Sequence, residues 1–482
     1  MLTSFVGRGT ELALLRKRLS RVTDSGRGVA VAVRGRRQVG KSRLVQEFCD
    51  RSGLPYLFFA ATKGQSPVEA VGDFLTELRQ SPLSVDPELV PSVTSWLDAL
   101  RALAAALPDS PSIVVLDELP WLAEQDEVFD GALQTAWDRL LANRPVLLLL
   151  LGSDLHMMQR LTAYDRPFYG RADNLVLGPL NPAETGAALG LTDADAVDAH
   201  LVSGGLPGIL GAWPDGLPAL EYLERECADP FSPVFGVPES ALLAEFPEPD
   251  QIRRVLEAIG GGDRTYANIA ATAGSRSGVV PSGTLSPLLH KLSGDKQIVA
   301  VDHPLATQPG KPALYRVADS NLRLYLAVLR GAAELARRGR SSAAFHLVER
   351  RWATWRGRAV EPLVRESLEL AALAGELPWP EVGVVGGWWN RQFDPEIDLV
   401  GADKGPIAAE IAFAGSIKWL ATPFDHRDLA ALHATAPTVP GYTARTGTVV
   451  ATRAGVANTL DKSSVDLVWG PTELINAWRT QG

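Results

Sequence analysis

The sequence predicts an α/β protein whose N-terminal part contains a parallel sheet, and three observations lead to this fold class. A glycine-rich loop at residues 35–42 follows a short apolar run at 28–33 and precedes residues 43–48, which have helical spacing. Two later apolar runs, at 112–118 and 146–151, are separated by stretches with helical patterns. Strands that alternate with helices form parallel sheets with helices on both faces. Residues 1–180 are therefore expected to form a three-layer α/β domain.

The glycine-rich loop has the spacing GxxxxGK[ST] of a phosphate-binding loop. A strand that enters a helix through such a loop directs backbone N–H groups and the positive end of the helix dipole at an anion. Lys41 is then expected to reach the β- and γ-phosphates of a nucleoside triphosphate, and the Ser42 hydroxyl to bind Mg²⁺. The expected nucleotide-binding residues of the loop are Gly35, Gln38, Val39, Gly40, Lys41, Ser42 and Arg43.

Polar residues follow the two later apolar runs. Asp117 and Glu118 end the first of them, and we expect Asp117 to hold Mg²⁺ through water. Glu118 is then the candidate general base that polarises the attacking water. Ser153 comes just after the second run. It has two open interpretations, as a sensor of the γ-phosphate or as the N-cap of a helix from Leu155 onward.

The composition is typical of a globular protein, with 46% hydrophobic and 21% charged residues in a chain of 482. This length suggests three or four domains. The net charge of −9 argues against indiscriminate coating of nucleic acid, although it allows a local basic face. The two cysteines form neither a disulfide framework nor a metal site, which favours the cytoplasm. Charges interrupt the N-terminal segment and the longest apolar run is far below ~20 residues, so we expect no signal peptide and no membrane partner.

The middle of the chain is expected to contain a helical lid and a winged helix. Residues 181–240 are mostly helical in pattern, and a proline-rich stretch at 229–249 is interpreted as a linker. Residues 245–330 have the order of a winged helix, three helices and then a hairpin. Its expected elements are helices at 251–259, from 265 onward and at 283–292, and strands at 298–301 and 313–317. The third helix offers only His290 and Lys291 to read DNA, so a packing or regulatory module is favoured over a DNA-binding one.

Five segments of the N-terminal part together resemble a known family. They are residues 5–8, 35–42, 116–121, 151–153 and 169–171. Their order is similar to that of archaeal-type P-loop ATPases, an AAA-like and STAND-related branch. The resemblance is strong to about residue 210 and looser beyond it. Members of this family often have a winged helix and a C-terminal domain of the restriction-endonuclease-like superfamily, which implies the same architecture here.

The resemblance also implies ligands and further site residues. It favours ATP with Mg²⁺ over GTP, in agreement with the absence of an N-K-x-D motif from the sequence. It places Arg8 in the segment that binds the nucleotide, and it makes Pro207 part of a G-x-P motif near the base; Pro207 in a simple loop turn is the alternative. Arg171 is implied to be a γ-phosphate or inter-subunit sensor, with a plain surface arginine as the alternative. A homo-oligomer is consistent with the second sensor role.

Residues 331–482 are expected to form the restriction-endonuclease-like domain. Seven arginines precede or open it and could contact phosphates or an acidic partner, although a solvated helix face is favoured: Arg337, Arg338, Arg340, Arg350, Arg351, Arg356 and Arg358. By resemblance to PD-(D/E)XK nucleases, Glu361 lies on the first helix and Asp398 on the strand that binds metal. The (D/E)xK pair that should follow is split between two registers. One keeps an acid at Glu410 and lacks the lysine, and the other keeps Lys418 and lacks the acid.

Three functional hypotheses remain. The favoured one is a regulatory switch that binds ATP and hydrolyses it weakly. The second is an ATP-gated, metal-dependent DNA nuclease, and a domain of this fold that does not cleave is at least as well supported. The third is a regulator that binds DNA through its winged helix. ATP is the expected ligand, and DNA or a protein partner is expected at the winged helix and the C-terminal domain.

Overall fold

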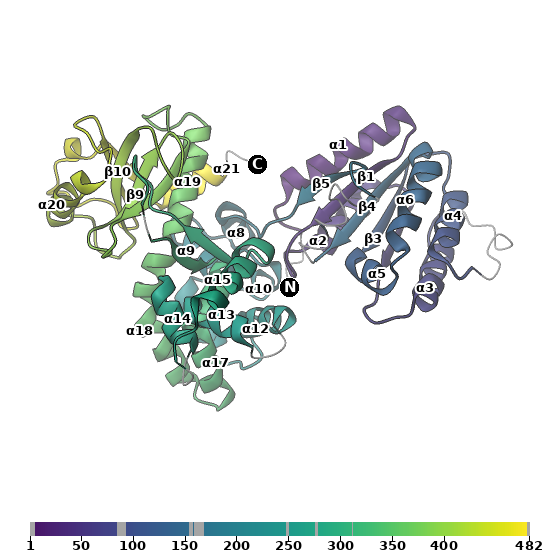
Figure 1. Ribbon diagram of the computed structural model, residues 1–482, viewed down its shortest axis with the longest axis horizontal. Helices are drawn as coiled ribbons and strands as arrows, with labels where there is room; N and C mark the ends of the chain where they lie inside the picture. The colour runs from purple at the N-terminus through teal and green to yellow at the C-terminus, as the bar shows by residue number, and fades with distance from the viewer. Residues whose placement is uncertain are drawn as a thin grey trace. The chain divides into compact units, whose positions relative to one another are not determined.

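The computed structural model describes residues 5–83, 93–153, 158, 168–246, 250–274, 278–310 and 312–479. Within these residues no helix is both long enough and apolar enough to cross a membrane. The chain divides into two compact units, one over Gly7–Pro179 and the other chiefly over Leu180–Gly482 (Figure 1). Each unit is described by itself below.

The N-terminal unit contains a parallel sheet with the strand order β2-β3-β4-β1-β5. The two central strands β3 and β4 are buried at every position, as expected for strands that are covered on both faces. This confirms the α/β fold class predicted from the alternating pattern. The strands are β1 Val29–Arg34, β2 Tyr56–Ala60, β3 Ser112–Asp117, β4 Val146–Gly152 and β5 Ala172–Val176.

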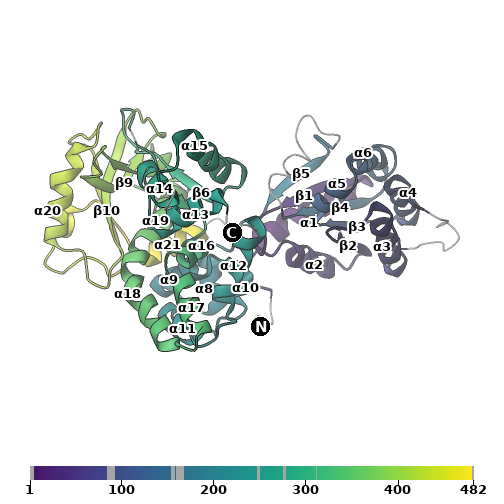
Figure 2. The same cartoon turned by 60° about the horizontal axis from the view of Figure 1, so that its bottom comes forward.

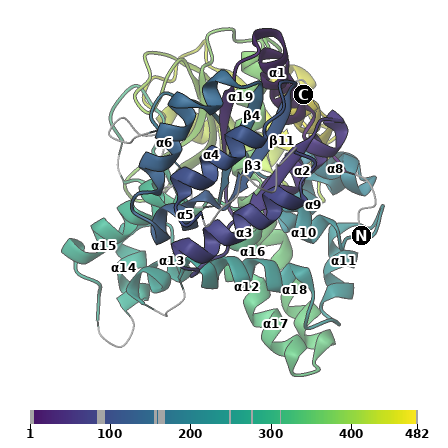
Figure 3. The ribbon, with the colours of Figure 1, turned by 90° about the vertical axis from the view of Figure 1, so that its right-hand side faces the viewer.

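Helices cover both faces of this sheet. One face packs against α3, α4 and α6, which lie side by side in Figure 3, and the other packs against α1. An aromatic cluster of Phe59, Phe74, Trp96 and Phe129 fixes the first layer, with ring centroids 5.1 to 6.1 Å apart. The helices are α1 Gly9–Ser25, α2 Lys41–Ser52, α3 Pro67–Gln80, α4 Trp96–Ala106, α5 Leu119–Gln125 and α6 Phe129–Arg139.

The strand order brings three predicted motifs to one edge of the sheet. Strand β4 lies between β1 and β3, and all three run in the same direction. Their carboxyl ends therefore lie side by side, although the loop after β1, the end of β3 and the end of β4 are far apart in the sequence. This is the position where ligands bind in open α/β sheets.

The second unit begins with helices, and one of them occupies the stretch that we expected to be a linker. Residues Pro233–Glu245 form α12, while residues 247–249 lie outside the described part of the chain. The helix forms because Pro233 stands in its first turn, where no N–H partner is needed, and the Ser232 hydroxyl accepts from the backbone N–H of Val234 at 3.2 Å. The helices before it are α8 Pro182–Leu189, α9 Asp193–Ser203, α10 Pro207–Leu210 and α11 Ala219–Glu226.

The next segment follows the order expected of a winged helix, with three helices and then an antiparallel hairpin. The elements are α13 Gln251–Gly261, α14 Tyr266–Gly274, α15 Ser282–His290, a turn of π-helix η4 at Lys291–Asp295, and strands β6 Val299–Asp302 and β7 Leu314–Val317. The hairpin strands agree with the expected ones to within a residue or two. Tyr266 of α14 bonds to the hydroxyl of Ser286 in α15 at 3.0 Å, which holds these two helices together.

A continuous helical stretch follows the hairpin and crosses the boundary that we expected at 330/331. It consists of α16 Ser320–Leu324, η5 Tyr325–Leu329 and α17 Arg330–Arg337. Two further helices, α18 Ser341–Ala359 and α19 Glu361–Leu373, connect it to the C-terminal sheet. Helices α17 and α18 pack side by side (Figure 2). The winged-helix segment and the C-terminal segment are thus parts of one compact unit.

The C-terminal sheet is mixed, with the strand order β12-β11-β10-β9-β8. The hairpin neighbours β8, β9 and β10 are antiparallel, while β10, β11 and β12 are parallel. Its elements are β8 Val384–Trp389, β9 Glu396–Ala402, β10 Ile411–Lys418, α20 His426–Thr435, η6 Ala436–Thr438, β11 Gly447–Thr452, η7 Lys462–Ser464, β12 Leu467–Trp469 and α21 Pro471–Arg479. This agrees with the α/β character predicted for the domain.

Candidate functional site

The phosphate-binding loop wraps around the Lys41 side chain. The Lys41 ammonium donates to the carbonyl oxygens of Gly35 at 2.8 Å and Arg36 at 3.0 Å. Gln38 and Gly40 have positive φ angles of 66° and 92°, which close the loop before α2 begins at Lys41. Burial lowers the pKa of Lys41, and the nearby Glu118 and Asp117 carboxylates oppose that shift. The ammonium is therefore held in place by the loop before any phosphate arrives.

Gly35 has no room for a side chain. A Cβ atom at this position would lie 2.3 Å from the carbonyl oxygen of Leu177, on the chain just after β5. The two backbones are in contact because Leu177 donates its N–H to the Arg34 carbonyl at 2.7 Å. The first glycine of the motif therefore permits the close approach of β5 to the start of the loop.

The metal-binding residues predicted from the sequence are in direct contact. The Ser42 hydroxyl donates to Asp117 Oδ2 at 2.5 Å, and Asp117 Oδ1 accepts from the backbone N–H of Glu118 at 2.8 Å. Burial raises the pKa of Asp117, while these two hydrogen bonds act in the opposite direction. A hydroxyl and one carboxylate suit Mg²⁺, which keeps several waters and takes its other ligands from substrate phosphates. This sparse arrangement agrees with the finding that the described residues contain no cluster of three metal-binding side chains.

Glu118 and Ser153 also meet at the edge of the sheet. The Ser153 hydroxyl donates to Glu118 Oε2 at 2.8 Å, and its backbone N–H lies 3.4 Å from the same oxygen. Glu118 has a left-handed backbone with φ 54°, which turns the chain sharply between β3 and α5. The alternative role of Ser153 as a helix N-cap involves Leu155, which lies outside the described residues. The structure thus joins the candidate base to the candidate γ-phosphate sensor.

Arg8 lies under the loop and contacts two carbonyl groups. Its guanidinium donates to Val39 at 2.9 Å and to Gly178 at 2.8 Å, and it also pairs with Glu11 at 3.1 Å. Only 4% of Arg8 is exposed. No local pattern in the sequence indicates the Gly178 contact, because that residue is 170 positions away and contributes only its backbone. Arg8 therefore links the phosphate-binding loop to the last residues of the N-terminal unit.

The other residues predicted for the nucleotide site are Arg171, Arg43 and Pro207. Arg171 makes a two-pronged ion pair with Asp138 of α6, at 2.7 and 2.8 Å. Arg43 is exposed on α2 and pairs with Glu47 at 2.9 Å. Pro207 begins α10 in the second compact unit. The sensor role of Arg171 and the base contact of Pro207 stay predictions.

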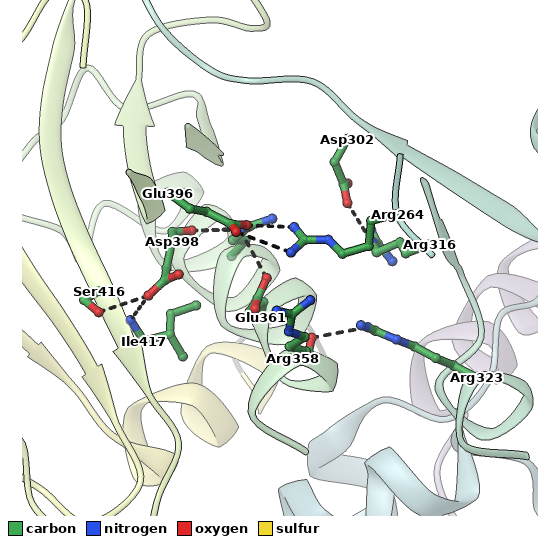
Figure 4. A network of polar contacts seen from close by, with 11 residues as sticks. Arg264, Asp302, Arg316, Arg323, Arg358, Glu361, Glu396, Asp398, Ser416 and Ile417 are labelled. Carbon is green, nitrogen blue, oxygen red and sulfur yellow. Dashed lines mark hydrogen bonds and ion pairs between the residues drawn. The ribbon is translucent and has the colours of Figure 1, made fainter. Parts of the chain in front are cut away.

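Asp398 on β9 and Glu361 at the start of α19 lie close together. Asp398 Oδ2 accepts from the Ser416 hydroxyl at 3.0 Å and from the Ile417 N–H at 2.9 Å (Figure 4). Burial raises the pKa of both carboxyl groups, and the positive charge of Arg365 opposes this shift in each of them. Arg365 approaches Glu361 at 3.5 Å and donates to the carbonyl of Asp398.

The other two residues of the expected nuclease-like site do not join this pair. Strand β10 pairs with β9 so that Asp398 faces Ser416, whereas Glu410 precedes the start of β10. Six residues of extended chain separate Glu410 from Ser416, which corresponds to roughly 20 Å. The Lys418 ammonium pairs with Asp428 at 2.7 Å. The register therefore places a serine opposite Asp398, at the position where the nuclease motif has its second acid.

Comparisons with known proteins bear on both ends of the chain. Residues 4–150 match a family model described as the AAA ATPase domain, and residues 325–428 match one described as archaeal and bacterial proteins of unknown function. The chain is 24% identical over 416 residues to an uncharacterized protein of Methanocaldococcus jannaschii, over 84% of this chain and 87% of that protein.

Among solved structures, a Walker-type ATPase of Pyrococcus abyssi is 18% identical, with 67% of this chain and 96% of that one covered and a TM-score of 0.47. The Orc1 protein of Aeropyrum pernix, solved in complex with DNA, is 15% identical, with 69% and 92% covered and a TM-score of 0.35. The first family match spans the phosphate-binding loop and the two carboxylates at the end of β3. The loop and the first of these carboxylates are in contact through the Ser42 hydroxyl and Asp117. Together with the second match, it supports an archaeal-type P-loop ATPase.

Proposed function

We propose that this ATPase binds ATP with Mg²⁺, hydrolyses it slowly and works as a nucleotide-controlled switch. The observation that supports slow, controlled hydrolysis is the hydrogen bond of 2.8 Å between the Ser153 hydroxyl and Glu118 Oε2. This bond occupies one oxygen of the carboxylate that is expected to polarise the attacking water. The base is therefore held by the residue that stands next to the expected position of the γ-phosphate.

The other residues of the site have roles that follow from their positions. Lys41 and the backbone N–H groups of the loop would bind the phosphates, the Ser42 hydroxyl would hold Mg²⁺, and Asp117 would hold it through water. When the γ-phosphate is present, it offers the Ser153 hydroxyl a second acceptor, which releases Glu118 toward the water. Catalysis then consists of positioning and charge stabilisation, as phosphoryl transfer requires.

Arg8 connects the phosphate-binding loop to the end of the N-terminal unit. It donates to Val39 in the loop and to Gly178, and Gly178 lies two residues before the boundary between the compact units. A change of the loop on nucleotide binding therefore alters the contact that fixes the end of the N-terminal unit. We propose that ATP acts through this contact on the C-terminal unit and on assembly with further copies or partners.

Replacing Glu118 by glutamine is expected to leave ATP bound and to slow hydrolysis at least about a hundredfold, because a general base contributes about 10² to 10⁴ in rate. ATP affinity is measured by calorimetry and single-turnover hydrolysis by phosphate release. Glu124→Gln is the matched control, since this exposed glutamate lies on the adjacent helix α5 and should have the wild-type rate. Hydrolysis by Glu118→Gln at the wild-type rate would exclude Glu118 as the base.

We further propose that the C-terminal domain has a nuclease-like fold that does not cleave DNA. The supporting observation is the register of β9 and β10, which leaves Asp398 bonded to Ser416 and places Lys418 on Asp428. Metal-assisted hydrolysis needs two or more convergent carboxylates and a cation near the attacking water. Glu361 and Asp398 lie close together, but Lys418, the expected cation, is paired with Asp428. Glu410, the expected third acid, precedes β10 and is distant from Asp398.

Incubation of the protein with plasmid and linear DNA is therefore expected to leave both intact, with Mg²⁺ or Mn²⁺ and with or without ATP. Asp398→Ala serves as the matched variant that distinguishes a contaminating nuclease from this domain. Metal-dependent cleavage by the wild type that disappears in Asp398→Ala would contradict the proposal and would make the nuclease the leading function.

A further inference from the structure

A cavity of about 390 Å³ lies in the second compact unit, where the end of α13, strand β7, helix α16, η5 and helix α18 meet. We call it the arginine cavity, because six arginines line it: Arg264, Arg316, Arg323, Arg350, Arg351 and Arg358. The residues that form its wall include no aspartate or glutamate. It does not include the phosphate-binding loop, and its Arg264 and Arg323 border the pair of Glu361 and Asp398 (Figure 4).

Only two of these arginines are paired with an acid. Arg264 bonds to Glu396 at 2.7 Å, and Arg316 bonds to Asp302 at 3.0 Å (Figure 4). The other four have no carboxylate within ion-pair distance in the described part of the chain. The contacts of Arg323 and Arg351 are with carbonyl oxygens, of Arg358 at 3.2 Å and of Ala327 at 2.9 Å, which do not cancel a charge. A protein of net charge −9 thus concentrates uncompensated positive charge at one concave site.

Arg323 has both cationic and acidic neighbours. Burial is the main cause that lowers the pKa of Arg323 to about 10; the Glu361 and Asp302 carboxylates oppose this shift, while Arg316 and Arg264 add to it. Like charges in a partly desolvated site destabilise one another, and a bound anion removes that cost. The cavity is therefore better suited to an anion than to water alone.

The apolar part of the wall offers contacts to the remainder of a ligand. Trp355 of α18 is 9% exposed, and its indole N–H is buried without a hydrogen-bond partner among the described residues. Trp355 therefore contributes apolar ring surface to the wall. Tyr315 and the glycines at 260–262 complete the wall and leave the backbone accessible.

We propose that the arginine cavity binds a small ligand that carries an oligophosphate group. Guanidinium groups bind phosphate oxygens through paired, charge-assisted hydrogen bonds, and several phosphates are needed to match four unpaired arginines. The volume lies within the range of small-molecule sites. The four unpaired arginines come from α16 and α18, and Arg323 of α16 donates to the Arg358 carbonyl at 3.2 Å, so they line one site. This site is separate from the ATPase site, and binding here would report a second chemical signal to the unit that contains the winged-helix segment.

The test uses the full-length Lys41→Ala protein, in which the phosphate-binding loop is disabled, and titrates it with tripolyphosphate by calorimetry. One saturable site is expected. The further double substitution Arg350→Ala with Arg358→Ala should weaken it at least about tenfold, because two charge-assisted contacts are lost. Both arginines are exposed, so the fold should be retained. Arg340→Ala removes an exposed arginine of the same run outside the cavity, and it should change the affinity less than about twofold.

A titration with ADP identifies the source of the phosphates, and a titration with a DNA duplex tests the alternative of a nucleic acid backbone. ADP is added to the same set of variants, and tighter binding of ADP than of tripolyphosphate assigns the ligand to nucleotides, whereas the reverse order assigns it to free oligophosphate. The proposal is overturned if neither binds the Lys41→Ala protein, or if the Arg350→Ala, Arg358→Ala pair binds both as tightly as its parent. It is also overturned if only a DNA duplex binds and loses affinity in this pair, since the arginines would then contact a nucleic acid backbone.

Discussion

ATP binding should weaken at least about a hundredfold when Lys41 is replaced by alanine. The ammonium is held at 2.8 and 3.0 Å from two carbonyl oxygens of the loop, so it is positioned before the nucleotide binds. Removing one partner of a buried charge pair costs about 2–5 kcal/mol, and about 2.7 kcal/mol corresponds to a factor of one hundred in affinity. The loop contains no other ammonium that could replace it.

Calorimetric titration with ATP and Mg²⁺ measures this effect directly. Lys63→Ala is a suitable control, because it removes an exposed lysine of the same unit and should bind ATP as the wild type does. Thermal unfolding of each variant shows that the fold is retained. If Lys41→Ala bound ATP with unchanged affinity, the assignment of the loop as the nucleotide site would be wrong.

Replacing Asp198 by alanine should destabilise the second unit by about 3–5 kcal/mol, the usual cost of leaving buried charges without their partner. Asp198 of α9 is 4% exposed, and its Oδ2 accepts from Arg356 at 2.8 Å and from Arg453 at 3.1 Å. Burial raises the pKa of Asp198, and the two guanidinium groups oppose this shift. The cluster joins the helices after residue 180 to α18 and to the chain after β11.

Urea unfolding followed by circular dichroism and tryptophan fluorescence gives the change in the transition of this unit. Asp195→Ala is the matched control on the same helix, since Asp195 is half exposed and lies 3.7 Å from Arg453. It should cost less than about 1 kcal/mol, as exposed ion pairs do. An equal, small effect of both substitutions would show that the buried cluster does not hold these helices together.

Local patterns were sufficient for most of the elements. The phosphate-binding loop, the strands that end at Asp117 and Gly152, and the three helices and hairpin of the winged-helix segment follow from apolar spacing and turn residues close in the sequence. The prediction of a linker is wrong over α12. Proline is typical of loops, but in the first turn of a helix, where Pro233 stands, it favours the helix. The split motif around Lys418 also signalled that a complete nuclease-like site would not form.

The sequence by itself predicted the candidate nucleotide site, because Lys41, Ser42 and Asp117 belong to short local motifs at the ends of strands, where the chain direction sets the position of each residue. Tertiary structure alone decided which distant groups meet. The Ser153 bond to Glu118 depends on the strand order, and the isolation of Glu410 depends on the register of β9 and β10. The arginine cavity depends on the packing of α13 and α18 against η5. Each is set by long-range packing of whole elements, and no local spacing in the sequence records it.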